Sequence, residues 1–292
     1  MREGYLEVDD DELDLRTTME VGQTFSWHKL SGENLYTGDG YRYYTTSDGD
    51  VLILWQEGGR LHYRASGGME KEVDQRLRLH ESLSSITEEL EGRDEVLDRA
   101  MERYQGLRIL NDDIFPCLVS YLCSPQMRIP RIKKMFDSIS EKYGSTVRKK
   151  GEEFLQFPTV EELSEATEDD LRHLGVGYRA KYIVKTVERI QKGVVDLERL
   201  EEMDYYVAHE EIKKLYGVGD KVGDCVLLFG AGHTEAFPVD TWIKKAVKRH
   251  YPDMYHSDYM ELADNFRKYF GKYTGYAQEY LFHHMRDQEN SS

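Results

Sequence analysis

The sequence predicts an α+β protein in which a β-rich N-terminal domain, residues 1–110, precedes a larger all-helical domain, residues 111–292. Two observations lead to this prediction. Residues 41–66 (YRYYTTSDGDVLILWQEGGRLHYRAS) alternate aromatic or β-branched residues with polar ones, as half-buried strands do. From about residue 70 onward the apolar spacing becomes helical and remains so. Hydrophobic residues make up 39 % of the chain, which is enough for a core in each part.

Residues 1–65 are expected to form strands joined by tight turns. The dipeptides Asp48-Gly49 and Gly58-Gly59 interrupt the alternating pattern, and both are favourable sequences for two-residue hairpin turns.

The helical part carries start and stop signals. Thr159 with Glu162, and Thr167 with Asp170, resemble capping boxes. Helices are expected to close at three glycines, which are Gly144, Gly175 and Gly193.

Composition excludes several classes of protein. No apolar run approaches the ~20 residues that a membrane span needs, so we expect no membrane partner. The N-terminus lacks the basic and then apolar layout of a secretory signal. Cys117, Cys123 and Cys225 are spaced too widely for a disulfide framework or a CxxC metal site, which indicates a reducing, intracellular setting.

The net charge of −16 argues against nucleic-acid binding, because phosphate contacts need Lys and Arg. The distribution is uneven, however. Residues 1–113 hold 26 acidic and 13 basic residues, whereas residues 121–150 hold eight basic and two acidic ones. An acidic body with such a basic stripe is compatible with DNA binding, although a solvated face of mixed charge is the commoner origin of this pattern.

Two short segments, each with an apolar residue between two glycines, precede helices: LGVG at 174–177 and LYGVG at 215–219. The second predicts a helix-hairpin-helix motif, in which Gly217, Val218 and Gly219 turn backbone N–H groups toward a DNA phosphate at the positive end of the following helix. A turn of this kind between helices is often only a tight turn, and spacing alone leaves both interpretations open.

Two charged residues follow the hairpin. Lys221 lies in the first turn of the second helix, where an amine can serve as a nucleophile, although most helical lysines are simply solvated. Asp240 follows Pro238-Val239 and is expected to cap the next helix. A capping carboxylate is held rigidly, so it can also face positive charge that develops on a sugar.

Taken together, GVGDKVGDC and AFPVD resemble the helix-hairpin-helix superfamily of DNA glycosylases, and within it the eukaryotic-type 8-oxoguanine DNA glycosylase. The likeness extends along most of the chain, through DLRTTMEVGQTFSW, PCLVSYLCS, RIPRI, LGVGYRAKY and GYAQEYLF, in that order. The resemblance implies a bifunctional DNA glycosylase/AP lyase that flips 8-oxoguanine out of duplex DNA and excises it in base excision repair.

The resemblance also assigns roles to residues. Lys221 would attack the anomeric carbon of the deoxyribose, and Asp240 would orient the lysine and stabilise the oxocarbenium-like sugar. The backbone carbonyl of Gly22 would accept the N–H that distinguishes 8-oxoguanine from guanine. Cys225 and Phe282 would sandwich the base. Without the family, these three would be interpreted as two core residues and a loop glycine.

Further assignments concern the pairing edge and the opposite strand. Gln278 would contact the pairing edge of the base. Arg131 and Arg179 would hold the cytosine left in the other strand, and Tyr178 would fill the vacated stack. Phosphate contacts or ordinary surface charge are the alternative for the arginines.

The chain departs from the family pattern at several positions. Residues 125–128 (PQMR) replace an asparagine-rich turn that probes the opposite base, which puts strict cytosine preference in doubt. Tyr216 stands where proline is usual, Gly223 where alanine is usual, and Trp242 where a histidine is usual.

No cofactor and no catalytic metal are expected. No cysteine follows Cys225, so the four-cysteine iron–sulfur cluster of some relatives is excluded, and the carbonyls of Leu215 and Val218 would hold at most a structural ion. We expect a monomer in the cytoplasm or at the nucleoid, or in the nucleus if the source is eukaryotic. Two alternatives stay open: a monofunctional alkylpurine glycosylase, which would not need Lys221, and a non-catalytic DNA-binding module, which would need neither Lys221 nor Asp240.

Overall fold

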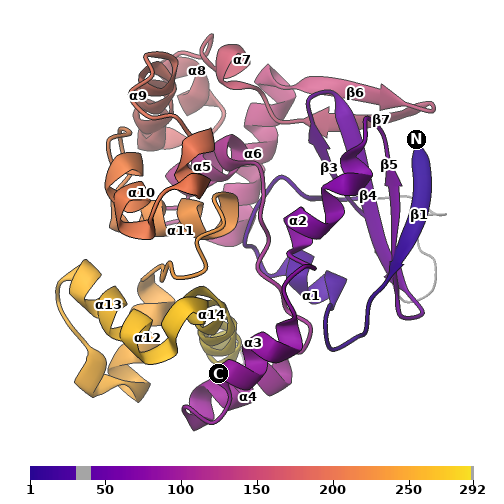
Figure 1. Ribbon diagram of the computed structural model, residues 1–292. Coiled ribbons are helices and arrows are strands. Elements are labelled where there is room, and N and C mark those ends of the chain that lie inside the picture. Colours follow the sequence, from indigo (N-terminus) through magenta and orange to yellow (C-terminus); the bar gives the residue numbers. More distant parts are fainter. Residues whose placement is uncertain (31–40, 291–292) are drawn as a thin grey trace.

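The computed structural model describes residues 1–30 and 41–290. A five-stranded antiparallel sheet, in the order β1-β5-β4-β3-β2, lies to one side of a larger helical body (Figure 1). Its strands are β1 (Arg2–Glu7), β2 (His28–Lys29), β3 (Tyr43–Ser47), β4 (Asp50–Glu57) and β5 (Arg60–Ala65). The predicted α+β fold, with a β-rich N-terminal part and a helical remainder, is confirmed.

Both predicted hairpin turns are confirmed. Asp48-Gly49 joins β3 to β4, and Gly58-Gly59 joins β4 to β5. All four residues have positive φ, between 49° and 77°, which is the left-handed conformation that a two-residue type I′ turn requires.

Strand β4 is the centre of the sheet and is buried on both faces. Leu52 and Leu54 point into a core shared with α1 (Leu15–Glu20) and α2 (Val73–Leu77). Helix α1 lies inside the region that was predicted to be all strand. Its start is set by Asp14, whose carboxylate accepts the N–H of Thr17 at 2.9 Å.

The opposite face of β4 is covered by a two-stranded ribbon, β6 (Ser145–Lys149) and β7 (Glu152–Gln156). Val147 and Phe154 of the ribbon pack on Val51 and Ile53 of β4. The prediction of uninterrupted helix after residue 70 is therefore wrong at this place. The reason is that this segment completes the sheet's second face, so tertiary packing determines its structure.

Helices make up the rest of the described chain, with short 3₁₀ turns between some of them, including η2 (Gly177–Arg179). In chain order, the helices between residues 83 and 250 are α3 (Leu83–Leu90), α4 (Glu95–Arg103), α5 (Ile114–Cys123), α6 (Ile129–Tyr143), α7 (Val160–Leu163), α8 (Glu168–His173), α9 (Ala180–Gln191), α10 (Tyr205–Ile212), α11 (Asp220–Gly230) and α12 (Thr241–His250). The last two are α13 (Tyr259–Phe270) and α14 (Thr274–Asn290). Both capping boxes, Thr159 with Glu162 and Thr167 with Asp170, are formed as predicted.

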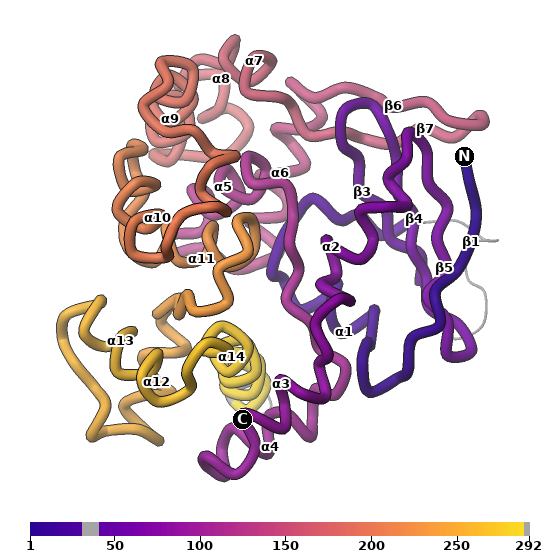
Figure 2. The backbone as a smooth tube through the Cα atoms, viewed as in Figure 1, coloured from indigo at the N-terminus to yellow at the C-terminus, as the bar shows by residue number. Residues whose placement is uncertain are grey.

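The helical body has one continuous apolar core, within which α5 packs against α11. Helix α14 lies beside α4, far away in sequence, as the tube drawing also shows (Figure 2). The core thus includes α3 and α4, which precede residue 111, and the domain boundary near residue 110 stays a prediction. Within residues 1–30 and 41–290, none of the helices combines the length and the apolar run that crossing a membrane would require.

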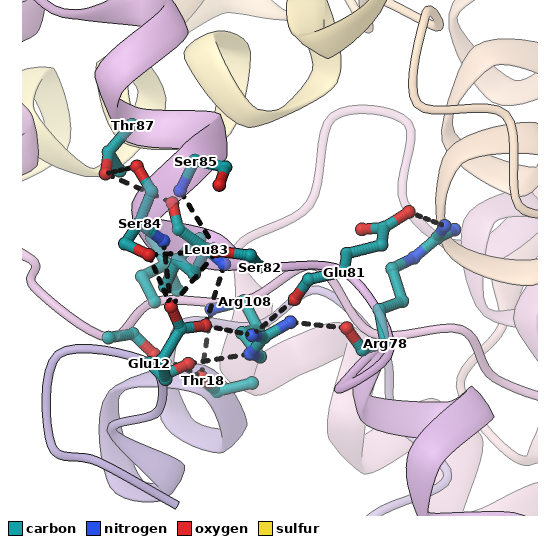
Figure 3. Close-up of polar contacts among 12 residues, drawn as sticks. Glu12, Thr18, Arg78, Glu81, Ser82, Leu83, Ser84, Ser85, Thr87 and Arg108 are labelled. Carbon is teal, nitrogen blue, oxygen red and sulfur yellow. Dashed lines mark hydrogen bonds and ion pairs between the residues drawn. The ribbon is translucent and has the colours of Figure 1, made fainter.

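A buried polar cluster joins the sheet part to the helices (Figure 3). Arg108, only 1 % exposed, donates from its guanidinium to the Glu12 carboxylate at 2.8 Å and to backbone carbonyls of Glu12, Arg78 and Glu81. Glu12 in turn accepts the N–H groups of Leu83 and Ser84 at 2.7 and 3.1 Å, and so caps α3 from a distant segment.

Candidate active site

Lys221 points inward, toward α5. Its side chain is half-buried, and its amine donates a hydrogen bond to the Ser124 hydroxyl at 3.1 Å. The same nitrogen lies 5.0 Å from the centre of the Tyr121 ring, close enough for a cation–π contact. These contacts distinguish Lys221 from a freely solvated surface lysine.

Asp240 is the N-cap of α12, as predicted, and accepts the N–H of Ile243 at 2.8 Å. Burial raises the pKa of Asp240 above its usual range, while the Ile243 hydrogen bond and the charge of Lys221 act in the opposite direction. The carboxylate of α12 and the amine of α11 therefore lie close enough to interact. Ionising Asp240 costs free energy in this setting, and a positive charge nearby reduces that cost.

Cys225 lies one helical turn after Lys221 and is buried as a free thiol. Burial raises its pKa to about 12, even though the charge of Lys221 lowers it. The thiol is therefore neutral at physiological pH and can pack as an apolar group.

The other predicted pocket residues lie on α14 and on the loop after α1. The Arg286 guanidinium lies 5.5 Å from the centre of the Phe282 ring and donates to the Val21 carbonyl at 2.8 Å, next to Gly22. Gly22 has φ of +94°, and a Cβ atom there would lie 2.8 Å from Ile129, so the position requires glycine. These contacts bring the Gly22 loop and the Phe282 face of α14 together.

Gln278 is only 3 % exposed, and its carbonyl oxygen accepts no hydrogen bond from any part of the chain that the structure describes. A buried acceptor without a partner is costly, so such a group is often completed by a ligand. Its neighbour Glu279 acts electrostatically on Asp240, which places this turn of α14 beside the α12 N-terminus.

Arg131, Tyr178 and Arg179 gather around η2. Tyr178 is 50 % exposed, and the Arg179 guanidinium lies 4.4 Å from the centre of its ring. Arg131 is exposed and donates to the Gly175 carbonyl at 3.3 Å. Arg179 is only 2 % exposed and donates to the Pro125 carbonyl. In this conformation Arg179 supports the 125–128 turn, whereas Tyr178 and Arg131 face solvent.

The hairpin between α10 and α11 has the predicted geometry. Gly217 has φ of +87°, and a Cβ atom there would lie 2.6 Å from the Tyr182 ring. Val218 is buried between the two glycines. Gly219 is the N-cap of α11, where no side chain caps the helix and open space surrounds the α-carbon. The first N–H groups of α11 are thus available to an anion.

The basic stripe is more strongly neutralised than the sequence suggested. Lys133 lies 2.7 Å from Asp137 and 3.0 Å from His28 Nδ1, which ties α6 to β2. Lys149 is bound to Asp50, and Arg148 to Glu153, at 2.7 Å each. The stripe is therefore partly a set of structural ion pairs.

Sequence reasoning missed Tyr121 and Ser124, which lie within the block PCLVSYLCS and contact Lys221. The Tyr121 hydroxyl also donates to the Gln23 carbonyl at 2.5 Å, so this ring joins the Gly22 loop to the amine. Their spacing along α5 resembles that of any core helix, and no local signal distinguishes them.

Comparison with known proteins agrees with this geometry. Residues 119–272 match the model of the HhH-GPD superfamily of base excision DNA repair proteins, and the chain belongs to this family. Residues 5–118 match the 8-oxoguanine DNA glycosylase N-terminal domain, which places the whole chain in the 8-oxoguanine glycosylase branch.

Three relatives illustrate the similarity. An N-glycosylase/DNA lyase of Arabidopsis thaliana is 31 % identical over 95 % of this chain and 78 % of its own length. The 8-oxoguanine glycosylase/lyase of Clostridium acetobutylicum in its apo form is 34 % identical, with a TM-score of 0.84 over 97 % of this chain and 96 % of that one. The same enzyme with double-stranded DNA containing cytosine opposite 8-oxoguanine is 33 % identical, with a TM-score of 0.84 over 100 % and 99 % of the two chains.

Proposed function

We propose that this protein is a DNA glycosylase/AP lyase that excises 8-oxoguanine from duplex DNA, with Lys221 as nucleophile and Asp240 as its carboxylate partner. The observation that carries the proposal is that an inward-facing amine and a half-buried, helix-capping carboxylate act on each other electrostatically, close to a buried amide oxygen that has no partner within the described residues.

The chemistry follows from these groups. The nitrogen lone pair of deprotonated Lys221 forms a bond to C1′ of the flipped nucleotide, and the N-glycosidic bond breaks with its electron pair leaving on the base. Asp240 stabilises the positive charge that develops on the sugar. The C1′–O4′ bond of the adduct then breaks as an amine proton passes to O4′, which gives a protonated Schiff base. In the β-elimination that follows, a C2′ proton is lost to the released base or to solvent while the C3′–O bond breaks, and the strand is nicked.

Recognition would use the remaining predicted residues. The Gly22 carbonyl accepts the N–H that guanine lacks, which discriminates strongly because the wrong base leaves a buried acceptor unpaired. Cys225 and Phe282 flank the base, and Gln278 supplies its free oxygen to the pairing edge. Arg131 and Tyr178 contact the opposite strand, and Arg179 joins them when it releases the Pro125 carbonyl. The N–H groups at Gly217, Val218 and Gly219 hold a phosphate.

Three finer points belong to the same proposal. The protein acts as a monomer on duplex DNA inside the cell, in the cytoplasm or at the nucleoid, or in the nucleus if the source is eukaryotic. It needs no cofactor. A structural ion at the hairpin would be held by the carbonyls of Leu215 and Val218.

Borohydride trapping on a duplex with 8-oxoguanine opposite cytosine tests the proposal. The wild-type protein should form a covalent adduct, and Lys221→Gln should form none while still binding the duplex, because an amide cannot form the imine. Lys214→Gln is a matched control, since Lys214 is paired with Glu211 on the surface. Trapping that persists in Lys221→Gln would exclude this residue as the nucleophile.

A further inference from the structure

Asp224, whose carboxylate is fully buried, lies on the same helix as Lys221 and takes no part in the proposed chemistry. It lies on α11, three residues after Lys221. Tyr205 and Tyr259 donate their hydroxyls to its two oxygens, the second at 2.7 Å. The Arg267 guanidinium and His209 Nε2 lie 3.5 and 3.8 Å from the first oxygen. These contacts come from α10 and α13, so Asp224 is fixed from two sides.

Tyr259 extends this network to the segment that carries Asp240. Its hydroxyl oxygen lies 2.7 Å from Asp224 Oδ2, 3.5 Å from the Phe237 carbonyl and 3.0 Å from the Val239 nitrogen. A hydroxyl has one proton, which goes to the nearer and stronger acceptor, Asp224. The oxygen then accepts the N–H of Val239, the residue immediately before Asp240.

We propose that Tyr259 is a positioning residue that holds the Asp240 segment in register with the Lys221 helix. The bridge runs from α11 through Asp224 and the Tyr259 hydroxyl to the Val239 backbone, and so joins the two elements that supply amine and carboxylate. The inference rests on the proposed roles of Lys221 and Asp240.

Without the hydroxyl, two buried groups would lose a partner at once, the Val239 N–H and one oxygen of Asp224. Water that replaced the hydroxyl at the Val239 N–H would lie next to the residue that precedes Asp240. The groups that act electrostatically on Asp240 come from three elements: Lys221 and Cys225 of α11, Tyr121 of α5 and Glu279 of α14. Within the described residues, the hydrogen bond of the Val239 N–H goes to Tyr259 and to none of these groups, so they do not replace the bridge.

The test uses Tyr259→Phe, which removes only the hydroxyl. Misplacement of catalytic groups by a fraction of an ångström slows the chemical step much more than it weakens binding. We expect single-turnover excision of 8-oxoguanine to fall about tenfold or more, with affinity for the same duplex within about twofold of wild type. We also expect the acidic limb of the pH–rate profile to move to lower pH, because water beside Asp240 relieves the burial that raises its pKa.

Tyr251→Phe is the matched control. The Tyr251 side chain is buried, and its hydroxyl donates to the Asp94 carboxylate at 2.8 Å, at the start of α4. It should also lose some thermal stability, because it leaves the half-buried Asp94 carboxylate with one donor fewer, but its rate and pH profile should match wild type.

Three results would overturn the inference: a wild-type rate in Tyr259→Phe, an equal rate loss in Tyr251→Phe, or an acidic limb that does not move. Asp240→Asn, measured in parallel, separates this from a failure of the proposed function. If Asp240→Asn excises 8-oxoguanine at the wild-type rate, the proposed role of Asp240 is wrong. Any rate loss in Tyr259→Phe then cannot be due to the positioning of Asp240.

Discussion

Asp240 combines two demands on one side chain. It caps α12, which favours a fixed and ionised carboxylate, but it does so in a buried place that raises its pKa. Catalytic sites often hold a group in a charge state that the fold disfavours. The free-energy cost is recovered when opposite charge develops in the transition state. The stability of the fold and the rate of the chemistry should therefore respond differently to its replacement.

Asp240→Asn should lower the excision rate by about a hundredfold or more, because it removes electrostatic stabilisation in a buried site. Asparagine still caps a helix, so the fold should survive. Because the folded-state pKa of Asp240 is raised, its contribution to stability falls as pH rises through that value. The free energy of unfolding of the variant should thus equal or exceed that of wild type at pH 7, and this difference should disappear near pH 4. Thermal unfolding at both pH values checks this, and a variant clearly less stable at pH 7 would contradict it.

At the scale of single elements, the hairpin offers a paired comparison. Gly217→Ala should destabilise the protein by about 1–3 kcal/mol, because alanine would adopt positive φ there and contact the Tyr182 ring. Gly219→Ala should unfold at the wild-type temperature, since φ is −102° and space is open. DNA affinity, measured with both variants under folded conditions, then reports on the phosphate site alone. Equal unfolding temperatures for the two variants would show that Gly217 is not required by the turn.

The turn at residues 125–128 affects which base the protein prefers opposite the lesion. Arg179 donates to the Pro125 carbonyl, and residues 125–128 are PQMR in place of the asparagine-rich turn that the resemblance led us to expect. Since one good base contact provides about 1–3 kcal/mol of discrimination, cytosine preference should be weaker than with a complete set of contacts. Single-turnover excision opposite each of the four bases measures it. A preference beyond about a thousandfold would mean that Gln126 or Arg128 supplies the missing contact.

The elements that sequence reasoning found are those fixed by local chemistry. The turns at Asp48-Gly49 and Gly58-Gly59, the capping boxes and the Asp240 cap all follow from residues within a few positions of each other. Helix α1 was missed although its Asp14 cap is local, and the β6–β7 ribbon was missed because its burial depends on partners far away in sequence. Tyr121 and Tyr259 were missed for the same reason, since only the folded chain brings them to Lys221 and Val239.

At the scale of the whole molecule, Arg108 and Glu12 join the N-terminal segment to the crossover before α5. Burial would raise the pKa of Glu12, but hydrogen bonds from Leu83 and Ser84 and the charge of Arg108 outweigh it and lower the pKa. A lowered folded-state pKa means that the unfolded chain binds more protons. The stabilisation is therefore complete above the unfolded value of about 4.3 and is lost as pH falls through the folded value.

Glu12→Gln should reduce the free energy of unfolding by about 2 kcal/mol at pH 7, because it weakens charge-assisted bonds to Arg108 and α3. The difference from wild type should shrink below about pH 4, where the wild-type carboxylate takes up a proton. Urea unfolding across this range checks the prediction. Glu7→Gln is the surface control, since Glu7 pairs with Arg60 in exposed positions and its loss should have little effect. A difference independent of pH would exclude the Glu12 charge as its source.

The ribbon on β4 and the Arg108 cluster fasten the sheet to the helical body at two places. Two separate attachments resist hinging of the sheet against the helical body, which favours a preformed binding surface. The motion that brings a nucleotide into the pocket must then come from the double helix, which has to kink and unstack at its own elastic cost. Excision should accordingly depend on the neighbours of the lesion, and proceed faster beside flexible pyrimidine–purine steps than within stiff A-tracts.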